Sequence, residues 1–129
     1  MREVALLFDQ HGNPIYLREG DSHCYIPDDP KYRWKVMWDN RDRMGGEVHT
    51  HPFSDIPVPS PTDVTTWSAI ERGLGRRFVW GIAAKFVTLF YVWTGPGLHD
   101  YMLVPHIAKD TIQGLLDRSF SEPQPQGGK

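Results

Sequence analysis

The sequence predicts one domain of the mixed α/β (α+β) class, in which helices flank a mixed β-sheet. Its 129 residues are the length of one ordinary domain, and such a chain removes roughly two-thirds of its unfolded surface from water. Hydrophobic residues make up 40% of the chain, which excludes general disorder. The predicted elements follow one another as strands, helix, strands and helix, an order typical of this class.

The first predicted elements are the two strands of a hairpin. Residues 4–8 are an apolar run typical of a buried strand. Residues 15–17 resume a strand pattern after a segment dense in turn residues, so we expect a hairpin over residues 3–18. Residues 19–30 contain three Asp, two Pro and one Gly and predict a loop.

Residues 32–44 fit two patterns. Their tryptophans and Met37 recur at helical spacing, yet three of their apolar residues also alternate as in a strand. We interpret the segment as a helix. The pair Gly45–Gly46 is expected to interrupt regular structure, and residues 47–51 predict a short strand that Pro52 ends.

The clearest predicted element is a helix with a well-formed start. Ser60 is a good N-cap residue, Pro61 suits the first helical position, and Asp63 places an acid in the first turn. The apolar residues that follow recur at helical spacing, and Gly73 and Gly75 are expected to end the helix.

The last part of the chain returns to strands before a final helix. Residues 78–83 and 86–93 are rich in aromatic and β-branched side chains and predict two strands, followed by a third at 101–104. Residues 106–120 predict an amphipathic helix, and residues 121–129 a disordered tail.

Composition excludes several classes of function. A net charge of -2 gives no global basic field, so we expect binding to neither nucleic acid nor a membrane surface. No apolar stretch reaches the length of a membrane helix, because Lys85 interrupts the best one, at 78–93. Cys24 is the single cysteine, which excludes an intramolecular disulfide and a Cys-rich zinc site. We therefore expect a cytoplasmic protein.

Three residues in the middle of the chain have the chemistry of a metal site. Alternate residues of a strand project from one face, so the side chains of His49 and His51 point to the same side. A catalytic zinc ion takes three protein ligands and keeps one open position. Asp63, in the first turn of the next helix, is the natural third ligand, and Ser60 lies one turn ahead of it.

Each part of this pattern also has a purely structural interpretation. Two histidines at the end of a strand often form a half-exposed polar face. Ser60 and Asp63 are also what a well-capped helix start contains. Neither interpretation explains why the two features occur at this distance from each other.

The spacing His-x-His-Pro-x7-Ser-x2-Asp resembles the motif of the JAMM (JAB/MPN-plus) metallopeptidases. The chain matches its fixed positions at His49, His51, Pro52, Ser60 and Asp63. The segment Gly-Glu-Val-His-Thr-His-Pro resembles the corresponding segment of the prokaryotic JAB branch. The resemblance implies a JAB/MPN-like domain of cytidine-deaminase-like architecture, here over residues 1–120.

The resemblance also implies roles for individual residues. His49, His51 and Asp63 would bind Zn²⁺, and Ser60 would donate a hydrogen bond to the oxyanion that forms on the substrate carbonyl. A glutamate upstream of the histidines would deprotonate the attacking water. Glu3 opens an apolar strand that resembles the family's glutamate-led strand, and we assign it as this base.

Two further glutamates precede the histidines. Glu47 lies on the same strand face as both of them and is expected to hydrogen-bond a ligand imidazole, which fixes the tautomer of that ring. Glu19 lies in a predicted loop and is the weakest candidate for the base.

The function implied by the resemblance is zinc-dependent hydrolysis of an amide or isopeptide bond. The expected substrate is a protein or peptide, such as the C-terminal tail of a ubiquitin-like or sulfur-carrier-like protein. Residues 19–44 depart from the family pattern, so the resemblance predicts the reaction better than it predicts the substrate. The alternative is a non-catalytic scaffold or recognition module of the same fold. A cupin-like barrel also uses His-x-His, but Phe53 and Ser54 follow the pair where that fold needs a glutamate.

Overall fold

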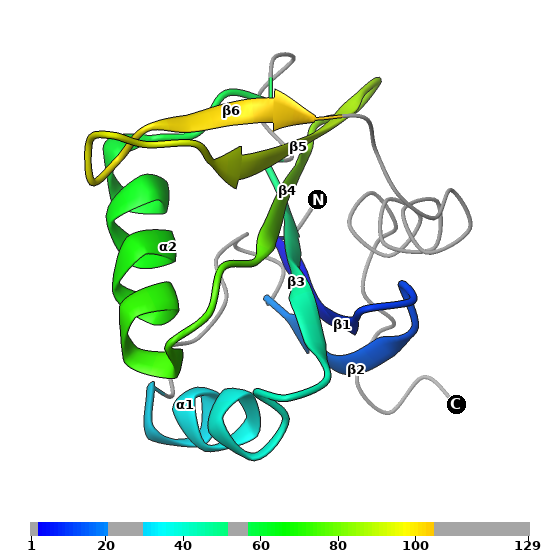
Figure 1. Cartoon of the computed structure of the whole chain (residues 1–129). Coiled ribbons are helices and arrows are strands. Elements are labelled where there is room, and N and C mark those ends of the chain that lie inside the picture. The colour runs from blue at the N-terminus through cyan, green and yellow to red at the C-terminus, as the bar shows by residue number, and fades with distance from the viewer. Residues whose placement is uncertain (1–2, 21–29, 52–56, 105–129) are drawn as a thin grey trace, which may run out of the picture.

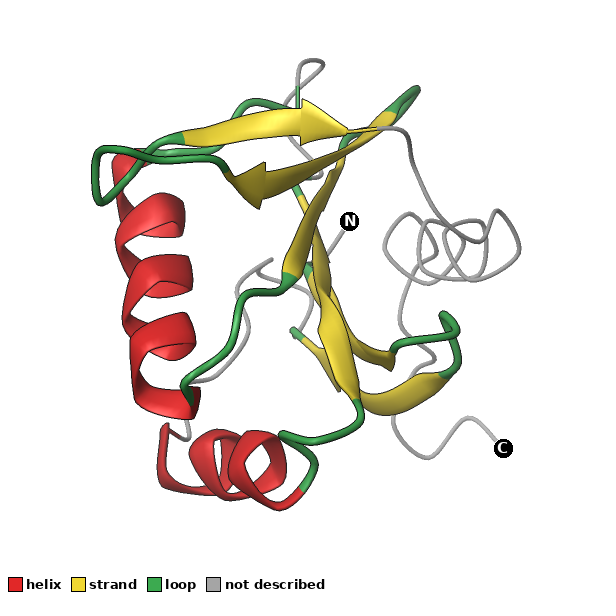
Figure 2. Cartoon of the chain, viewed as in Figure 1, coloured by secondary structure: helices red, strands yellow, loops and turns green. Residues whose placement is uncertain are grey.

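The computed structural model describes residues 3–20, 30–51 and 57–104, which form a six-stranded mixed sheet and two helices (Figures 1 and 2). The mixed α+β class predicted from the sequence is confirmed. In chain order the elements are β1 (Val4–Asp9), β2 (Pro14–Glu19), α1 (Pro30–Asp39), β3 (Met44–Thr50), α2 (Pro61–Leu74), β4 (Val79–Ala83), β5 (Thr88–Trp93) and β6 (Tyr101–Val104).

The strands lie in the order β2-β1-β3-β4-β5-β6. All neighbours are antiparallel except β3 and β4, which are parallel and are connected through α2. A parallel pair needs such a crossover, because a tight turn cannot return the chain to the same end of the sheet. The carboxyl end of β3 therefore lies close to the start of the segment that leads into α2.

Both helices pack on one face of the sheet. Apolar side chains of α1 and α2 bury this face against the central strands, where Trp67 of α2 stacks on Trp80 of β4 with ring centroids 5.7 Å apart. The opposite face has its own apolar cluster. The buried residues of that second cluster are Val4, Leu6, Phe8, Val48, Ala83 and Phe90.

A buried carboxylate joins the end of α2 to the sheet. Glu71 is 2% exposed and accepts hydrogen bonds from the backbone N–H of Phe78 at 2.9 Å and from Trp80 Nε1 at 3.1 Å. The guanidinium of Arg77 and the hydroxyl of Tyr101 also donate to it. The side chain of Glu71 thus connects α2 to β4 and β6. This attaches one end of α2 to the sheet, and Asp63 lies at the other end of the same helix.

The structure corrects the sequence prediction around the two glycines. The hairpin and the helix at 32–44 are present, although α1 ends at Asp39, but Gly45–Gly46 does not interrupt regular structure: both glycines belong to β3. A Cβ on Gly46 would lie 1.7 Å from the carbonyl oxygen of Val79. Glycine is needed here because β4 approaches the backbone too closely for a side chain.

Several predicted features lie outside the described residues. These are the final helix at 106–120, the tail at 121–129, most of the loop at 19–30, Cys24 and Pro52. Within the described ranges, neither helix has the length and apolar character needed to cross a membrane.

Candidate metal centre

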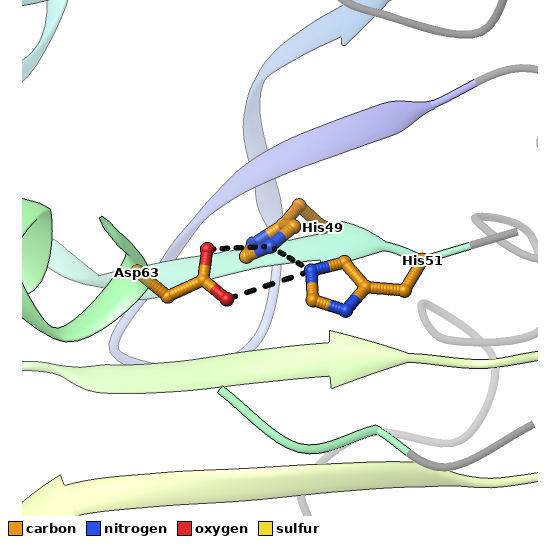
Figure 3. Close-up of side chains that lie close together, drawn as sticks. All are labelled: His49, His51 and Asp63. Carbon is orange, nitrogen blue, oxygen red and sulfur yellow. Dashed lines mark hydrogen bonds and ion pairs between the residues drawn. The ribbon is translucent and has the colours of Figure 1, made fainter. Parts of the chain in front are cut away.

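The structure brings His49, His51 and Asp63 together at the end of β3 (Figure 3). The two Nε2 atoms of the histidines are 2.9 Å apart. Asp63 Oδ1 lies 3.3 Å from the Nε2 atom of His49, and its Oδ2 lies 3.5 Å from that of His51. Three potential ligand atoms therefore face a common point.

These distances suit a zinc ion. Zn–N bonds of about 2.0–2.1 Å in a tetrahedral site put neighbouring ligand atoms roughly 3.3–3.4 Å apart. The two histidine–aspartate distances are close to that separation, although they end on different oxygens of Asp63, and the histidine–histidine distance is shorter, in the range of a hydrogen bond. Two imidazole nitrogens and one carboxylate are also the donor set of a catalytic zinc site with one open position. The residues present thus fit a metal ion.

Strand pairing places both histidines on the helix-covered face. His49 of β3 is opposite Ala5 of β1 and next to Ile82 of β4. The backbone N–H of His51 donates to the carbonyl of Ala83 at 2.9 Å, which extends the pairing beyond the end of β3. Alternate residues of this extended segment point the same way, as the sequence predicts.

The start of α2 positions the third ligand. Ser60 is the N-cap: its Oγ accepts a hydrogen bond from the backbone N–H of Asp63 at 3.1 Å. In return, Asp63 Oδ2 accepts from the backbone N–H of Ser60 at 2.8 Å. This reciprocal capping box holds the carboxylate in one orientation, and Pro61 occupies the first helical position. The capped helix start predicted from the sequence is confirmed.

The protonation states of the site suit a metal ion. Burial raises the pKa of the Asp63 carboxyl, but hydrogen bonds from His49 and Ser60 outweigh burial and hold that pKa at about 2. Burial and then the neighbouring His49 lower the pKa of His51, while Asp63 opposes them. At neutral pH the carboxylate is charged and the His51 imidazole is neutral, as metal binding requires.

The capping box gives a first testable prediction. Ser60→Ala is expected to lower the free energy of unfolding by about 1 kcal/mol, because the backbone N–H of Asp63 loses its acceptor. Ser60→Asn retains a capping oxygen and is the matched control. Urea unfolding followed by circular dichroism measures both. Equal stabilities of the two variants would show that the cap contributes nothing.

The three ligands lie in the wall of a cavity of about 450 Å³. Strands β2 and β3, both helices and Glu3, the residue before β1, contribute to it. The residues that line the cavity are Glu3, Arg18, Arg33, Glu47, His49, His51, Ser60, Thr62, Asp63, Thr66 and Trp67.

Glu3, assigned from the sequence as the base, lies in this cavity with the ligands. The register pairs Ala5 with His49, and its extension by two residues puts Glu3 opposite His51. Residues opposite each other in an antiparallel pair project from the same face. The neighbouring backbone is held firmly, since the N–H of Val4 donates to Thr50 Oγ1 at 2.9 Å. Glu3 is therefore on the face that carries both histidines.

Glu47 lies on the same face, but arginines hold its carboxylate. Its Oε1 accepts from Arg33 at 3.1 Å and its Oε2 from Arg18 at 3.3 Å. Burial raises the pKa of Glu47, whereas Arg33 and Arg18 lower it more, so the net shift is downward. Glu47 is thus a charged partner of two arginines, and a contact with an imidazole that fixes its tautomer stays a prediction.

The remaining candidates lie away from the centre. Glu19 of β2 follows Arg18, whose side chain faces the cavity, so that of Glu19 projects from the opposite face. His11 is exposed in the turn of the hairpin, and His99 is exposed in the turn before β6.

Sequence reasoning missed Arg18 and Arg33. Arg18 is two residues after Tyr16 on β2, and the strand alternation puts both on the cavity face. The alternation along this strand was therefore the sequence pattern that could have placed Arg18 on the cavity face. Arg33 lies on α1, in the segment whose pattern fits both a helix and a strand.

Comparison of the sequence with models of known protein families gives no match, and no curated protein matches it significantly.

Proposed function

We propose that the protein is a zinc-dependent hydrolase of amide or isopeptide bonds, a JAMM-type metallopeptidase with a JAB/MPN-like domain. One observation carries the proposal: His49, His51 and Asp63 have ligand atoms within 4.8 Å of one another, in a cavity that Glu3 also lines. A metal site alone needs no carboxylate beyond its ligands. A hydrolase needs one for its general base.

The proposed mechanism assigns one role to each residue. His49, His51 and Asp63 would hold a zinc ion, which would supply a Lewis acid to polarise a carbonyl and lower the pKa of water. Glu3 accepts the proton of the attacking water and passes it to the departing amine. Ser60 Oγ accepts from the backbone of Asp63, so its own hydrogen donates to the carbonyl oxygen as that oxygen gains charge.

We propose a protein substrate, cleaved at an extended C-terminal tail such as that of a ubiquitin-like or sulfur-carrier-like protein. The resemblance of the motif to the prokaryotic JAB branch supports this choice.

The alternative is a non-catalytic scaffold or recognition module of the same fold. One observation favours it: the capping box gives both Ser60 and Asp63 a structural role that needs no metal ion. It leaves the convergence of His49 and His51 on the same carboxylate without an explanation.

Metal content tests the proposal first. The wild-type protein, purified without chelator or nickel affinity resin, is expected to hold about one zinc ion per chain. His51→Ala is expected to lose it, since two ligands remain. His11→Ala removes an exposed histidine from the hairpin turn and is the matched control. Elemental analysis after dialysis against zinc measures all three.

Two results would overturn the metal centre. One is a folded wild-type protein without bound zinc, and the other is a His51→Ala variant with the zinc content of the wild type. Circular dichroism of each sample establishes that the fold is retained.

A further inference from the structure

The cavity contains two arginines that the proposed reaction leaves without a role. Arg18 comes from β2 and Arg33 from α1, and both donate to Glu47. A guanidinium has five N–H donors in a planar fork that matches a carboxylate. One ion pair with Glu47 occupies only part of that capacity. Among the described residues, Glu47 is the one side chain to which either guanidinium donates, so we assign the other donors to a ligand in the cavity.

The strand register places Arg18 beside the metal centre. Arg18 of β2 is opposite Ala5 of β1, which is itself opposite His49 of β3. Strands are about 4.8 Å apart, so roughly 10 Å separates the backbones of Arg18 and His49. Ala5 lies between them and fills the space with only a methyl group. Both guanidiniums therefore border the same space as the histidines.

The arginine side of the cavity carries a positive charge, whereas the carboxylates of Glu3 and Asp63 line other parts of it. Two guanidiniums face a single carboxylate, so the group formed by Arg18, Arg33 and Glu47 has a net charge of about +1. The side chain of Glu47 is 7% exposed, whereas those of Arg18 and Arg33 are 16% and 24% exposed. The side chain of Glu47 is thus the least exposed of the three, and those of the two arginines reach further towards the open cavity.

Arg33 gives independent evidence that its hydrogen bonds are incomplete. Its Nε is buried and has no hydrogen-bond partner within the part of the chain that the structure describes. Buried donors in folded proteins are nearly always paired, so a buried donor without a protein partner calls for a bound water or a ligand. Glu47 alone does not satisfy this guanidinium.

We propose that Arg18 and Arg33 form a carboxylate subsite, which selects substrates with a carboxylate within two residues after the cleaved amide. The inference rests on the proposed function. An extended residue spans about 3.3–3.6 Å, so two residues bridge roughly 7 Å from the metal centre towards the arginines. Hydrolysis breaks the C–N bond, adds the water's hydroxyl to the acyl carbon and its proton to the amine. The released product carries the carboxylate.

Ligand binding to the metal-free protein tests the subsite without any need for catalysis. The probes are N-acetyl-glycyl-glycine and its C-terminal amide, titrated into the protein and followed by NMR chemical shifts. The acid is expected to bind about tenfold more tightly than the amide, the effect of one charge-assisted hydrogen bond. Without zinc, direct ligation of the acid by the metal does not contribute.

Two arginine variants and a control localise the effect. Arg18→Gln and Arg33→Gln are each expected to lose the preference for the acid. Arg43→Gln keeps it, because Arg43 lies after α1 and bonds Asn40 away from the cavity. Equal binding of acid and amide to the wild type, or a preference that survives in both cavity variants, would overturn the subsite.

Glu47→Gln keeps the test decisive if an arginine variant fails to fold. It leaves both guanidiniums in place and removes the carboxylate that competes for them, so acid binding is expected to tighten about tenfold. Unchanged or weaker binding of the acid would count against the subsite.

A third probe identifies the source of the carboxylate. N-acetyl-glycyl-aspartyl amide has an acidic side chain but no free C-terminus. If it binds as tightly as the acid, the subsite reads an acidic residue; if it binds like the neutral amide, the subsite reads a chain end. Binding of either carboxylate supports the subsite even if the protein holds no zinc or hydrolyses no amide. The tests can therefore contradict the subsite and the proposed hydrolase independently.

Discussion

Glu3→Gln is expected to slow amide hydrolysis about 10²- to 10⁴-fold while the protein keeps its zinc. Glutamine preserves the size and polarity of the side chain but does not accept the proton of the attacking water. The zinc ligands are His49, His51 and Asp63, so metal content should not change. The measurement is cleavage of a proteome-derived peptide library by zinc-loaded protein, with new termini counted by mass spectrometry.

Glu19→Gln is the matched control. Glu19 also precedes the histidines, but its side chain projects from the other face of the sheet. It should cleave the library at the wild-type rate. Wild-type activity in Glu3→Gln would remove Glu3 as the base. Absence of cleavage by zinc-loaded wild type would favour the non-catalytic scaffold.

Glu71→Ala is expected to lower the free energy of unfolding by about 3–5 kcal/mol. The change leaves Arg77 unpaired and removes the acceptor of two buried donors, the backbone N–H of Phe78 and Trp80 Nε1. It also opens a cavity at the junction of α2 with the sheet. Urea unfolding monitored by tryptophan fluorescence measures the loss.

Glu71→Gln separates hydrogen bonding from charge in this junction. The amide keeps one acceptor oxygen and the volume of the side chain, so the loss of stability should be smaller than for alanine. A loss below about 1 kcal/mol for Glu71→Ala would mean that packing alone holds the end of α2 to the sheet.

The centre was predictable from the sequence because its parts are local. The alternation of His49 and His51 along a strand and the capped start of α2 each depend on a few neighbouring residues. The two meet because a parallel β3–β4 pair requires a crossover, which returns α2 across the face that carries the histidines.

The rest depends on contacts between distant segments. Position 46 of β3 must be glycine because the backbone of Val79, 33 residues later, comes too close for a side chain. From the sequence alone, a glycine more readily indicates a turn. Arg18 and Arg33 meet at Glu47 only through the pairing of β2 with β1 and the packing of α1. No local pattern in the sequence encodes that meeting.

One carboxylate both caps α2 and faces the histidines, so the binding of an ion and the ordering of the first helical turn are coupled. Asp63 Oδ2 accepts from the backbone of Ser60, while Oδ1 points to His49. A cation that binds Asp63 therefore restrains the first turn of the helix, and an ordered first turn presents the carboxylate for binding. Thermodynamic reciprocity makes the two effects equal in size. Amide hydrogen exchange in the first turn of α2 thus reports whether an ion is bound to Asp63. Ion binding is expected to slow this exchange by the same factor by which the capped turn raises the affinity for the ion.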